Sequence, residues 1–359
     1  MKKLRSLAIC CIALSFLVSA CSANKTNDKI SIPLLLHTNV DGANVDGDVA
    51  TYSGAWDLLQ CSVTMNKKLY QSATPTAVHP VLWDGKNSFV MEDLPVSIEN
   101  KNLSFDNNLV SDGFMRYFCS PSLTITLKDQ GGVKTTKILH YQDQNGRKST
   151  SEVPDIKPPQ EYGIADIVSE HEIFYAAYDG GTIYAFFEVI GSKTGIFTVY
   201  CLTYNPTDRN NGTWTKFDLD GKSVANSWYQ NVVFSDKKLY LSAVDDLVEL
   251  DVSNNKIIKL SNITEKVKKI IPNSSQEAPA GPTAILPYGA WDDVVIAYLP
   301  VYTQDNSGHT VYFAFKDNKF LGAIDITNDA INVYDSAYKL KNTCLSGSHL
   351  VSVSLPKVR

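Results

Sequence analysis

An acidic segment close to the N-terminus has the side-chain composition of a calcium site. Within ten residues it offers five carboxylate or amide side chains, and its glycines permit sharp turns; these five are Asn39, Asp41, Asn44, Asp46 and Asp48. Calcium prefers such hard oxygen ligands, although the segment lacks the spacing and the closing glutamate of an EF-hand. The alternative is a polar turn after a strand expected over residues 30–36. We take Asp41, Asp46 and Asp48 as candidate calcium ligands, and the sequence indicates no other cofactor.

A second candidate site comes from the motif Gly-Ala-Trp-Asp, which occurs at residues 54–57 and again at 289–292. In each copy an indole ring stands beside a carboxylate. An aromatic face packs on a sugar ring and a carboxylate accepts hydrogen bonds from its hydroxyls, so the candidate ligand-facing residues are Trp56, Asp57, Trp291 and Asp292. The alternative is that each Trp packs between sheets while each Asp caps a turn.

Signatures of catalysis are missing from the sequence. It contains no Gly-x-Ser-x-Gly elbow, no His-Glu-x-x-His motif and no phosphate-binding loop. No histidine stands three to five residues from another, so there is no local metal pair. Beyond residue 20 the chain has only four arginines, and Arg147 and Arg209 fall in polar segments expected to be turns. The three-arginine carboxylate site of sialidase-like propellers is therefore not indicated, and we assign no catalytic residue.

The first twenty-one residues have the order of a secretory signal peptide. Lys2, Lys3 and Arg5 precede an apolar run over residues 7–17, which is too short for a permanent membrane span. Val18-Ser19-Ala20-Cys21 then resembles the lipobox of bacterial lipoproteins. The resemblance implies that the Cys21 thiol receives a diacylglycerol and that the peptide is cut before it. Ser22 resembles the outer-membrane class, if the source is Gram-negative.

Maturation makes the chain more acidic. Losing the three cations of the leader takes the net charge from −5 to −8, so nucleic acid is not an expected partner. Attachment to the membrane would instead depend on acyl chains, at about 0.8 kcal/mol per buried methylene. We predict a signal peptide over residues 1–20, a lipidated tether over 21–29 and one domain over 30–359, with 153–161 as the weakest point of that domain.

Four cysteines remain after Cys21, and none forms a Cys-x-x-Cys motif. An even number in an exported chain favours disulfides. Cys61 and Cys119 both follow short apolar or aromatic runs, so we predict that they form a disulfide. The other two are Cys201, which lies in an expected strand, and Cys344.

The body of the chain reads as short strands joined by tight turns. Residues 232–260 contain four such runs with polar clusters between them, a pattern that resembles one blade of a β-propeller. Only residues 263–271 suggest a helix. The Trp-Asp dipeptide resembles the signature of WD40 blades, but no Gly-His partner precedes it at blade spacing. We predict an all-β fold and favour a propeller of six or seven blades; a pair of β-sandwiches, divided near residues 153–161, is the alternative.

These features favour a lipid-anchored, non-enzymatic binding or assembly module of the cell envelope, which would present loops to a protein partner or a glycan. The alternative is a carbohydrate-active hydrolase that uses Asp or Glu residues from separate blades.

Changing Cys21 to Ala should abolish lipidation and leave an unprocessed or soluble form, because the thiol is the only acceptor at the lipobox. Detergent-phase partitioning of the wild type and of Cys21→Ala measures this. Equal partitioning of the two proteins would contradict the lipobox interpretation.

Overall fold

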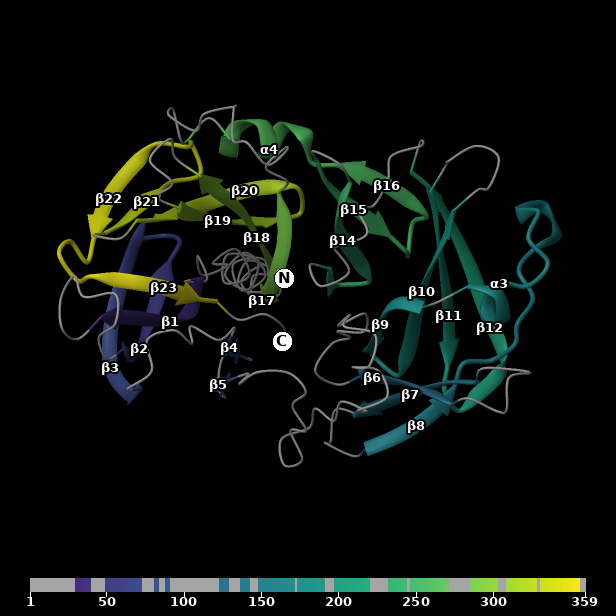
Figure 1. Ribbon diagram of the computed structural model, residues 1–359. Coiled ribbons are helices and arrows are strands. Elements are labelled where there is room, and N and C mark those ends of the chain that lie inside the picture. The colour runs from purple at the N-terminus through teal and green to yellow at the C-terminus, as the bar shows by residue number, and fades with distance from the viewer. Residues whose placement is uncertain are drawn as a thin grey trace, which may run out of the picture.

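The chain folds almost entirely into antiparallel β-sheets, which confirms the all-β prediction. The computed structural model describes residues 30–39, 49–72, 81–83, 88–90, 123–128, 136–142, 148–171, 173–190, 197–219, 232–243, 246–268, 270, 285–302, 308–327 and 330–355. In this part of the chain the strands form six sheets, which lie around a common centre in Figure 1.

Four of the sheets contain the strands β1 to β12, and one of these four also includes the last strand, β23. One has the order β23-β1-β2-β3, with β23 (Leu350–Ser354), β1 (Ser31–Asn39), β2 (Val49–Asp57) and β3 (Ser62–Ser72). A two-stranded sheet pairs β4 (Val81–Trp83) with β5 (Ser88–Val90). A three-stranded sheet contains β6 (Leu123–Lys128), β7 (Thr136–Gln142) and β8 (Lys148–Glu152). The next contains β9 (Ile173–Asp179), β10 (Thr182–Ile190), β11 (Phe197–Asn205) and β12 (Asp208–Asp218).

Two further sheets complete the arrangement. One contains β13 (Val233–Ser235), β14 (Lys238–Ala243), β15 (Asp246–Asp251) and β16 (Lys256–Lys259). The other has six strands in chain order: β17 (Leu286–Trp291), β18 (Val294–Tyr302), β19 (Gly308–Lys316), β20 (Lys319–Ile326), β21 (Ile331–Tyr334) and β22 (Leu340–Cys344).

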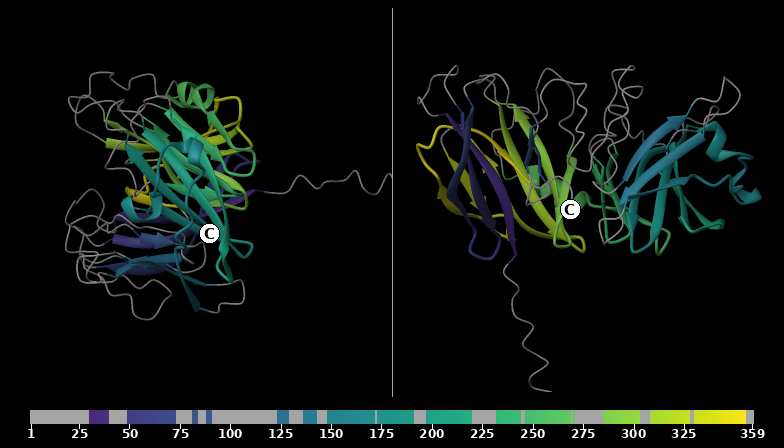
Figure 2. Two further views of the ribbon diagram at one scale, coloured as in Figure 1. Left: turned by 90° about the vertical axis from the view of Figure 1, so that its right-hand side faces the viewer. Right: turned by 90° about the horizontal axis from the view of Figure 1, so that it is seen from below.

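Neighbouring sheets pack face to face, as the view from below in Figure 2 shows. The strand β18 illustrates the consequence. Val294 and Ile296 belong to the apolar cluster shared with the β23-β1-β2-β3 sheet, whereas Val295, Ala297 and Leu299 belong to the cluster shared with β13–β16. Strands that bury both faces read as continuous apolar runs rather than as an alternating pattern.

Four hairpin turns use two residues that both have positive φ. These are Gly180-Gly181, Asp236-Lys237, Asp292-Asp293 and Asp317-Asn318. Positive φ at both positions matches the twist of the flanking strands, and Gly, Asp and Asn adopt it most readily. These residue types mark the turns locally, and the β13–β14 hairpin lies within residues 232–260, where the sequence predicts strands separated by polar clusters.

Helices are few and short in the described residues: η1 (Gln160–Tyr162), α3 (Ile167–Glu170) and α4 (Ser261–Lys268). The helix α4 overlaps the segment 263–271 where the sequence suggests a helix, but begins two residues earlier and ends at Lys268. Ser261 and Thr264 both donate hydrogen bonds to the carboxylate of Asp246, the Thr264 bond at 2.9 Å, which fixes the start of α4 against β15. None of these helices combines the length and apolar character needed to cross a membrane.

The strand β12 corrects one expectation. The sequence places Arg209 in a polar segment expected to be a turn, but only Pro206 and Thr207 lie in the turn, and β12 begins at Asp208. Its first half is polar because β12 is an edge strand, whose residues 208–211 are exposed to solvent. The polar side chains of residues 208–211 therefore indicate a solvent-exposed strand and not a loop.

The two ends of the chain meet in one sheet. The penultimate part of the sequence, β23, pairs antiparallel with β1, with Leu36 opposite Val353 and His37 opposite Ser352. Two tyrosines of the six-stranded sheet contact this C-terminal segment. The Tyr312 hydroxyl donates a hydrogen bond to the Val353 carbonyl at 3.5 Å, and Tyr288 forms a hydrogen bond with the main chain of Leu355. The sheet that holds the N-terminal strands is therefore completed by the C-terminal strand.

His37 should make this junction sensitive to acid. It is only 4% exposed, with Nδ1 2.9 Å from Thr51 Oγ1, and burial lowers its pKa from 6.5 to about 4. The unfolded chain therefore binds more protons than the folded protein between pH 6.5 and 4, so stability falls as the pH drops through this window. In His37→Asn the free energy of unfolding should fall less between pH 6.5 and 4 than in the wild type, by on the order of 2–3 kcal/mol.

Denaturant unfolding at a series of pH values measures the effect. The matched control is His349→Asn, because His349 is exposed. Identical pH profiles for the wild type and His37→Asn would contradict the assignment.

Candidate functional site

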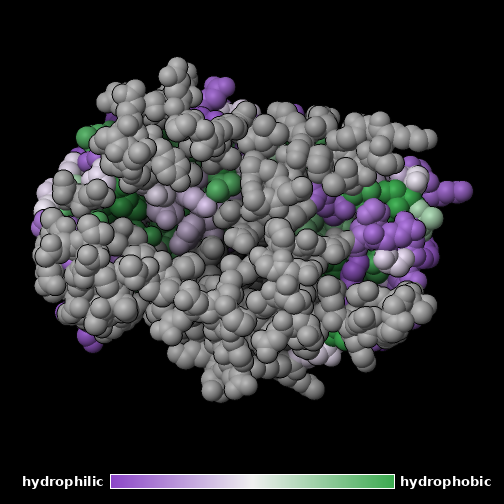
Figure 3. Space-filling model, in the orientation of Figure 1, coloured by the Kyte–Doolittle hydropathy of each residue, from purple (hydrophilic) through white to green (hydrophobic). Residues whose placement is uncertain are grey.

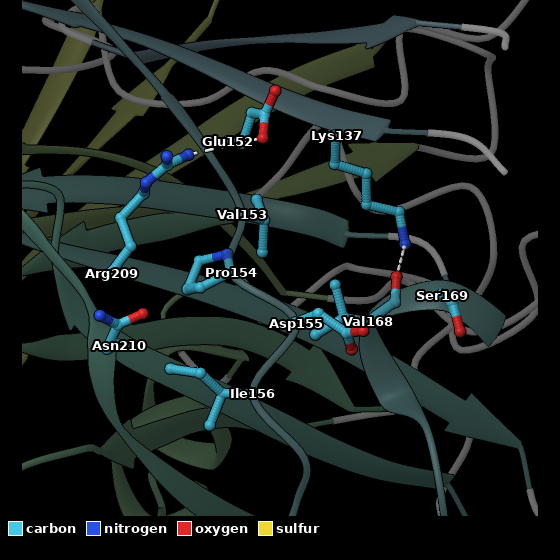
Figure 4. Close-up of a pocket in the computed structure, with 10 residues that line it drawn as sticks. All are labelled: Lys137, Glu152, Val153, Pro154, Asp155, Ile156, Val168, Ser169, Arg209 and Asn210. Atoms are coloured by element: carbon cyan, nitrogen blue, oxygen red, sulfur yellow. Dashed lines mark hydrogen bonds and ion pairs between the residues drawn. The ribbon is translucent and has the colours of Figure 1, made fainter.

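A cavity of about 530 Å³ opens between β8, the segment that follows it, α3 and the start of β12. Figure 4 shows the ten residues that line it: Lys137, Glu152, Val153, Pro154, Asp155, Ile156, Val168, Ser169, Arg209 and Asn210. The surface over this side of the molecule, where α3 and β12 lie, mixes hydrophilic with hydrophobic residues in Figure 3. The volume falls within the range of about 300–1,000 Å³ that is typical of small-molecule sites.

A buried lysine forms the inner wall. Lys137 on β7 is 7% exposed, and its ammonium group donates to the main-chain carbonyls of Val168, at 2.6 Å, and of His171. These carbonyls lie at the C-terminal end of α3, where a cation is favoured electrostatically. The ammonium also lies 5.4 Å from the ring centroid of Phe187, within range of a cation–π interaction. Lys137 therefore fixes α3 against the β6–β8 sheet.

An ion pair crosses the outer rim. Arg209 reaches from β12 toward Glu152 of β8 in Figure 4, with Nη1 3.5 Å from Oε2. Both side chains are at least half exposed, so solvent screens the pair and a ligand carboxylate could compete with Glu152 for the guanidinium. Asn210 and Ser169 add neutral hydrogen-bonding groups beside it.

A second set of charges links the segment after β8 to the start of α3. Lys157 Nζ lies 3.0 Å from Asp155 and 2.8 Å from Asp166. Asp166 also accepts a hydrogen bond from the Ser169 amide at 3.0 Å and so caps α3. Hydrogen bonds from Lys157 and Ser169 hold the pKa of Asp166 well below its usual value, which keeps the cap ionised.

The floor of the cavity is held by packing behind it. Trp214 Nε1 donates to the Ile156 carbonyl at 3.0 Å, and Tyr162 donates to the Trp214 carbonyl at 3.3 Å. A Cβ at Gly212 would lie 2.6 Å from Ile156 Cδ1, so the Ile156 side chain packs directly on the β12 backbone at this glycine. Residues 153–161, which the sequence marks as the weakest point of the domain, are thus packed on β12 and β7, where Val153 N donates to Lys137 O at 2.9 Å.

The site therefore offers donors and acceptors of both charges within one cavity. Its carboxylates, Glu152 and Asp155, lie three residues apart on one segment, and each contacts a cation. No cluster of metal-ligating side chains occurs in the described ranges. The arrangement suits the binding of a polar ligand more than acid–base chemistry.

The first Trp-Asp pair does not face a ligand, which corrects the sequence interpretation. Trp56 is 0% exposed and packs in the core between the β23-β1-β2-β3 and β17–β22 sheets. Asp57 is 8% exposed and accepts hydrogen bonds from the amides of Leu59, at 3.1 Å, and Gln60, at 2.9 Å. The alternative reading, a core tryptophan followed by a turn-capping aspartate, is correct here.

The second pair lies at a similar place. Trp291 ends β17 and packs, partly buried, against the same apolar cluster as Trp56. Asp292 follows it as the first residue of a two-residue turn, with φ 46°. Nothing in this geometry brings Trp291 and Asp292 together with the first pair into one binding surface.

Three other predictions lie outside the described residues: lipidation of Cys21, the calcium ligands Asp41, Asp46 and Asp48, and the partner of Cys61 in the predicted disulfide, Cys119. Cys61 itself lies in the turn between β2 and β3. These three remain predictions.

The sequence gives little warning of the cavity. Lys137 is one lysine within an ordinary strand, and Arg209 stands in a stretch that reads as a loop. Pro154, Pro158 and Pro159 do mark the segment between them as irregular, and that is the signal which points toward the site.

Comparisons with known proteins give only remote similarity. No protein-family model and no curated protein matches the chain. Among solved structures it is similar to apo AztD from Citrobacter koseri, with 9% identity and a TM-score of 0.25 over 91% of this chain and 98% of AztD. It is also similar to the extracellular domain of BT4673 from B. thetaiotaomicron, with 12% identity and a TM-score of 0.24. That match covers 88% of this chain and 33% of the other, so the chain spans about a third of that domain's length. Similarity at this level carries no argument about function.

Lys137→Met should loosen α3. The substitution keeps the aliphatic stem but leaves the carbonyls of Val168 and His171 without this donor, at a cost of about 1–3 kcal/mol. Thermal unfolding and amide hydrogen exchange of residues 167–171 measure the change. The matched control is Lys157→Met, an exposed lysine of the same site, which should have a smaller effect on stability; an equal or larger effect would contradict the role given to Lys137.

Proposed function

We propose that this chain is a lipid-anchored, non-enzymatic binding module of the bacterial cell envelope, built as a six-bladed β-propeller. The leader with its lipobox supports the location. Six antiparallel sheets placed around a common centre support the propeller, as does the sheet that takes strands from both ends of the chain. A paired β-sandwich is a weaker account, because the four apolar clusters join the sheets in succession rather than in two pairs.

The observation that carries the binding role is the state of the charged groups in the cavity. Lys137 donates hydrogen bonds to two main-chain carbonyls and is not available to a ligand. Arg209, by contrast, is half exposed, and its ion pair with Glu152 is long, at 3.5 Å, and open to solvent. A ligand carboxylate can therefore replace Glu152 as the partner of Arg209 while the buried contacts of the fold stay in place. The hydroxyl or amide groups of the ligand can then contact Asn210 and Ser169. We propose a small acidic glycan of the envelope as the ligand.

The hydrolase alternative receives less support. Burial raises the pKa of Glu188 to about 7, which suits a general acid, and burial also raises the pKa of Glu249. These glutamates stand in separate sheets, on β10 and β15, but neither lines the cavity, and Lys238 lies 3.5 Å from Glu249.

Binding of an acidic envelope saccharide tests the proposal. The probe is the disaccharide of N-acetylglucosamine and N-acetylmuramic acid, titrated calorimetrically into the full mature protein in detergent. Arg209→Ala should weaken binding about tenfold or more, because a charge-assisted hydrogen bond is lost. Lys216→Ala is the control, since Lys216 is a cation of the same strand that does not line the cavity. Absence of binding, or equal loss in both variants, would refute the proposal.

A further inference from the structure

Two cysteines from distant parts of the chain lie close together where the first sheet meets the six-stranded sheet. Cys61 occupies the turn between β2 and β3, and Cys344 is the last residue of β22. The main-chain amide of Val63, two residues after Cys61, lies 3.4 Å from the Cys344 sulfur across 281 residues of sequence. Both cysteines are partly buried against the same apolar cluster, and both carry free thiols in the structure.

Charged residues of the β21–β22 hairpin place it against Cys61 as well. Burial and then Asp335 raise the pKa of the Cys61 thiol, while Lys341 lowers it. Asp335 and Lys341 form an ion pair of 3.1 Å across that hairpin. Strands β21 and β22 both contact β3, which begins at Ser62, directly after Cys61.

Cys61 can reach Cys344 if the turn that contains it moves. Two residues of extended chain span at most about 7 Å, so the Val63 amide beside the Cys344 sulfur brings Cys61 within reach of it, and a shift of the turn would bring the two Cα atoms to the roughly 4.4–6.8 Å that a disulfide requires. Cys61 has φ 47° and lies in a turn, where its thiol donates a hydrogen bond to the Leu58 carbonyl at 3.7 Å. β22 is an edge strand whose residues 340–343 are exposed, so few contacts resist its adjustment.

We propose that Cys61 and Cys344 form a disulfide after export, which ties the turn beside the N-terminal strands to the end of β22. Each thiol gives up one proton and one electron as the S–S bond forms. A thiol-oxidising protein of the envelope accepts both electrons through its own disulfide, which becomes a dithiol. This pairing excludes the disulfide between Cys61 and Cys119 that the sequence suggests.

Cys201 does not compete for either partner. It is 0% exposed in the core between β9–β12 and β13–β16, and its thiol lies 3.7 Å from the Thr203 hydroxyl. Burial raises the pKa of Cys201 to about 12, so the thiolate needed for exchange is not formed at neutral pH.

Peptide mapping without reduction tests the pairing directly. Intact cells are alkylated before lysis, so that only free thiols are labelled, and the protein is then isolated from the envelope. We expect one linked peptide that joins Cys61 to Cys344, and Cys119→Ser should leave this link intact. A link between Cys61 and Cys119, or alkylated Cys61 and Cys344, would overturn the inference.

Thermal unfolding provides a second measurement. Cys61→Ser, Cys344→Ser and the double variant should lower the Tm by the same amount, roughly 5–10 °C for a loop of this length. A reductant should lower the Tm of the wild type to the same value but leave the double variant unchanged. Additive shifts in the double variant, or a wild type that does not respond to reductant, would show that the two sulfurs are not joined.

Discussion

The pairing of β23 with β1 is the interaction on which the rest of the structure depends. Each of the other sheets in the described chain is built from strands that follow one another in sequence, so each can form locally. Within the described residues, only the β23-β1-β2-β3 sheet takes strands from both ends of the chain, so its formation joins segments that lie far apart in the sequence. Contacts of such long sequence separation cost loop-closure entropy, which local hairpins avoid. The tyrosines Tyr288 and Tyr312, with rings 5.2 Å apart and nearly perpendicular, offset part of this cost by holding β23 against the six-stranded sheet.

The same constraint determines where a binding site can form. Strands inside the stack bury both faces, so the described polar groups that remain accessible belong mainly to turns, strand ends and edge strands. The cavity near α3 follows this rule, because Arg209 and Asn210 lie on the exposed start of an edge strand and Asp155 lies in an irregular segment. Lys137 is the exception, a buried cation retained because the end of α3 supplies carbonyl acceptors. At this cavity the buried Lys137 therefore holds the fold together, whereas the exposed groups remain accessible to solvent.

Local features of the fold could be predicted from the sequence, and features that depend on packing between sheets could not. Asp317-Asn318 and Gly180-Gly181 encode their turns in their own backbone preferences, so the hairpins around them were predictable. Trp56 and Trp291 carry the same motif, yet whether an indole faces a ligand or the core depends on which sheet lies beside it. The cavity could not be predicted for the same reason, because Lys137 and Arg209 line one cavity only once β7 and β12 have packed in the fold. Cys344 approaches the chain beside Cys61 only because the β21–β22 hairpin adds two strands to the last sheet, a packing that the sequence does not reveal.

The most direct test of this account is amide hydrogen exchange of the full chain and of a chain that ends at residue 344, before β23. If closure by β23 holds the sheets together, removing it should reduce protection in β1 and also in β17–β19, which contact it through the tyrosines. The loss should extend into the clusters on both sides of the six-stranded sheet as one cooperative change. Loss of protection confined to β1, with the other sheets unchanged, would contradict the claim that the fold depends on the joining of its two ends.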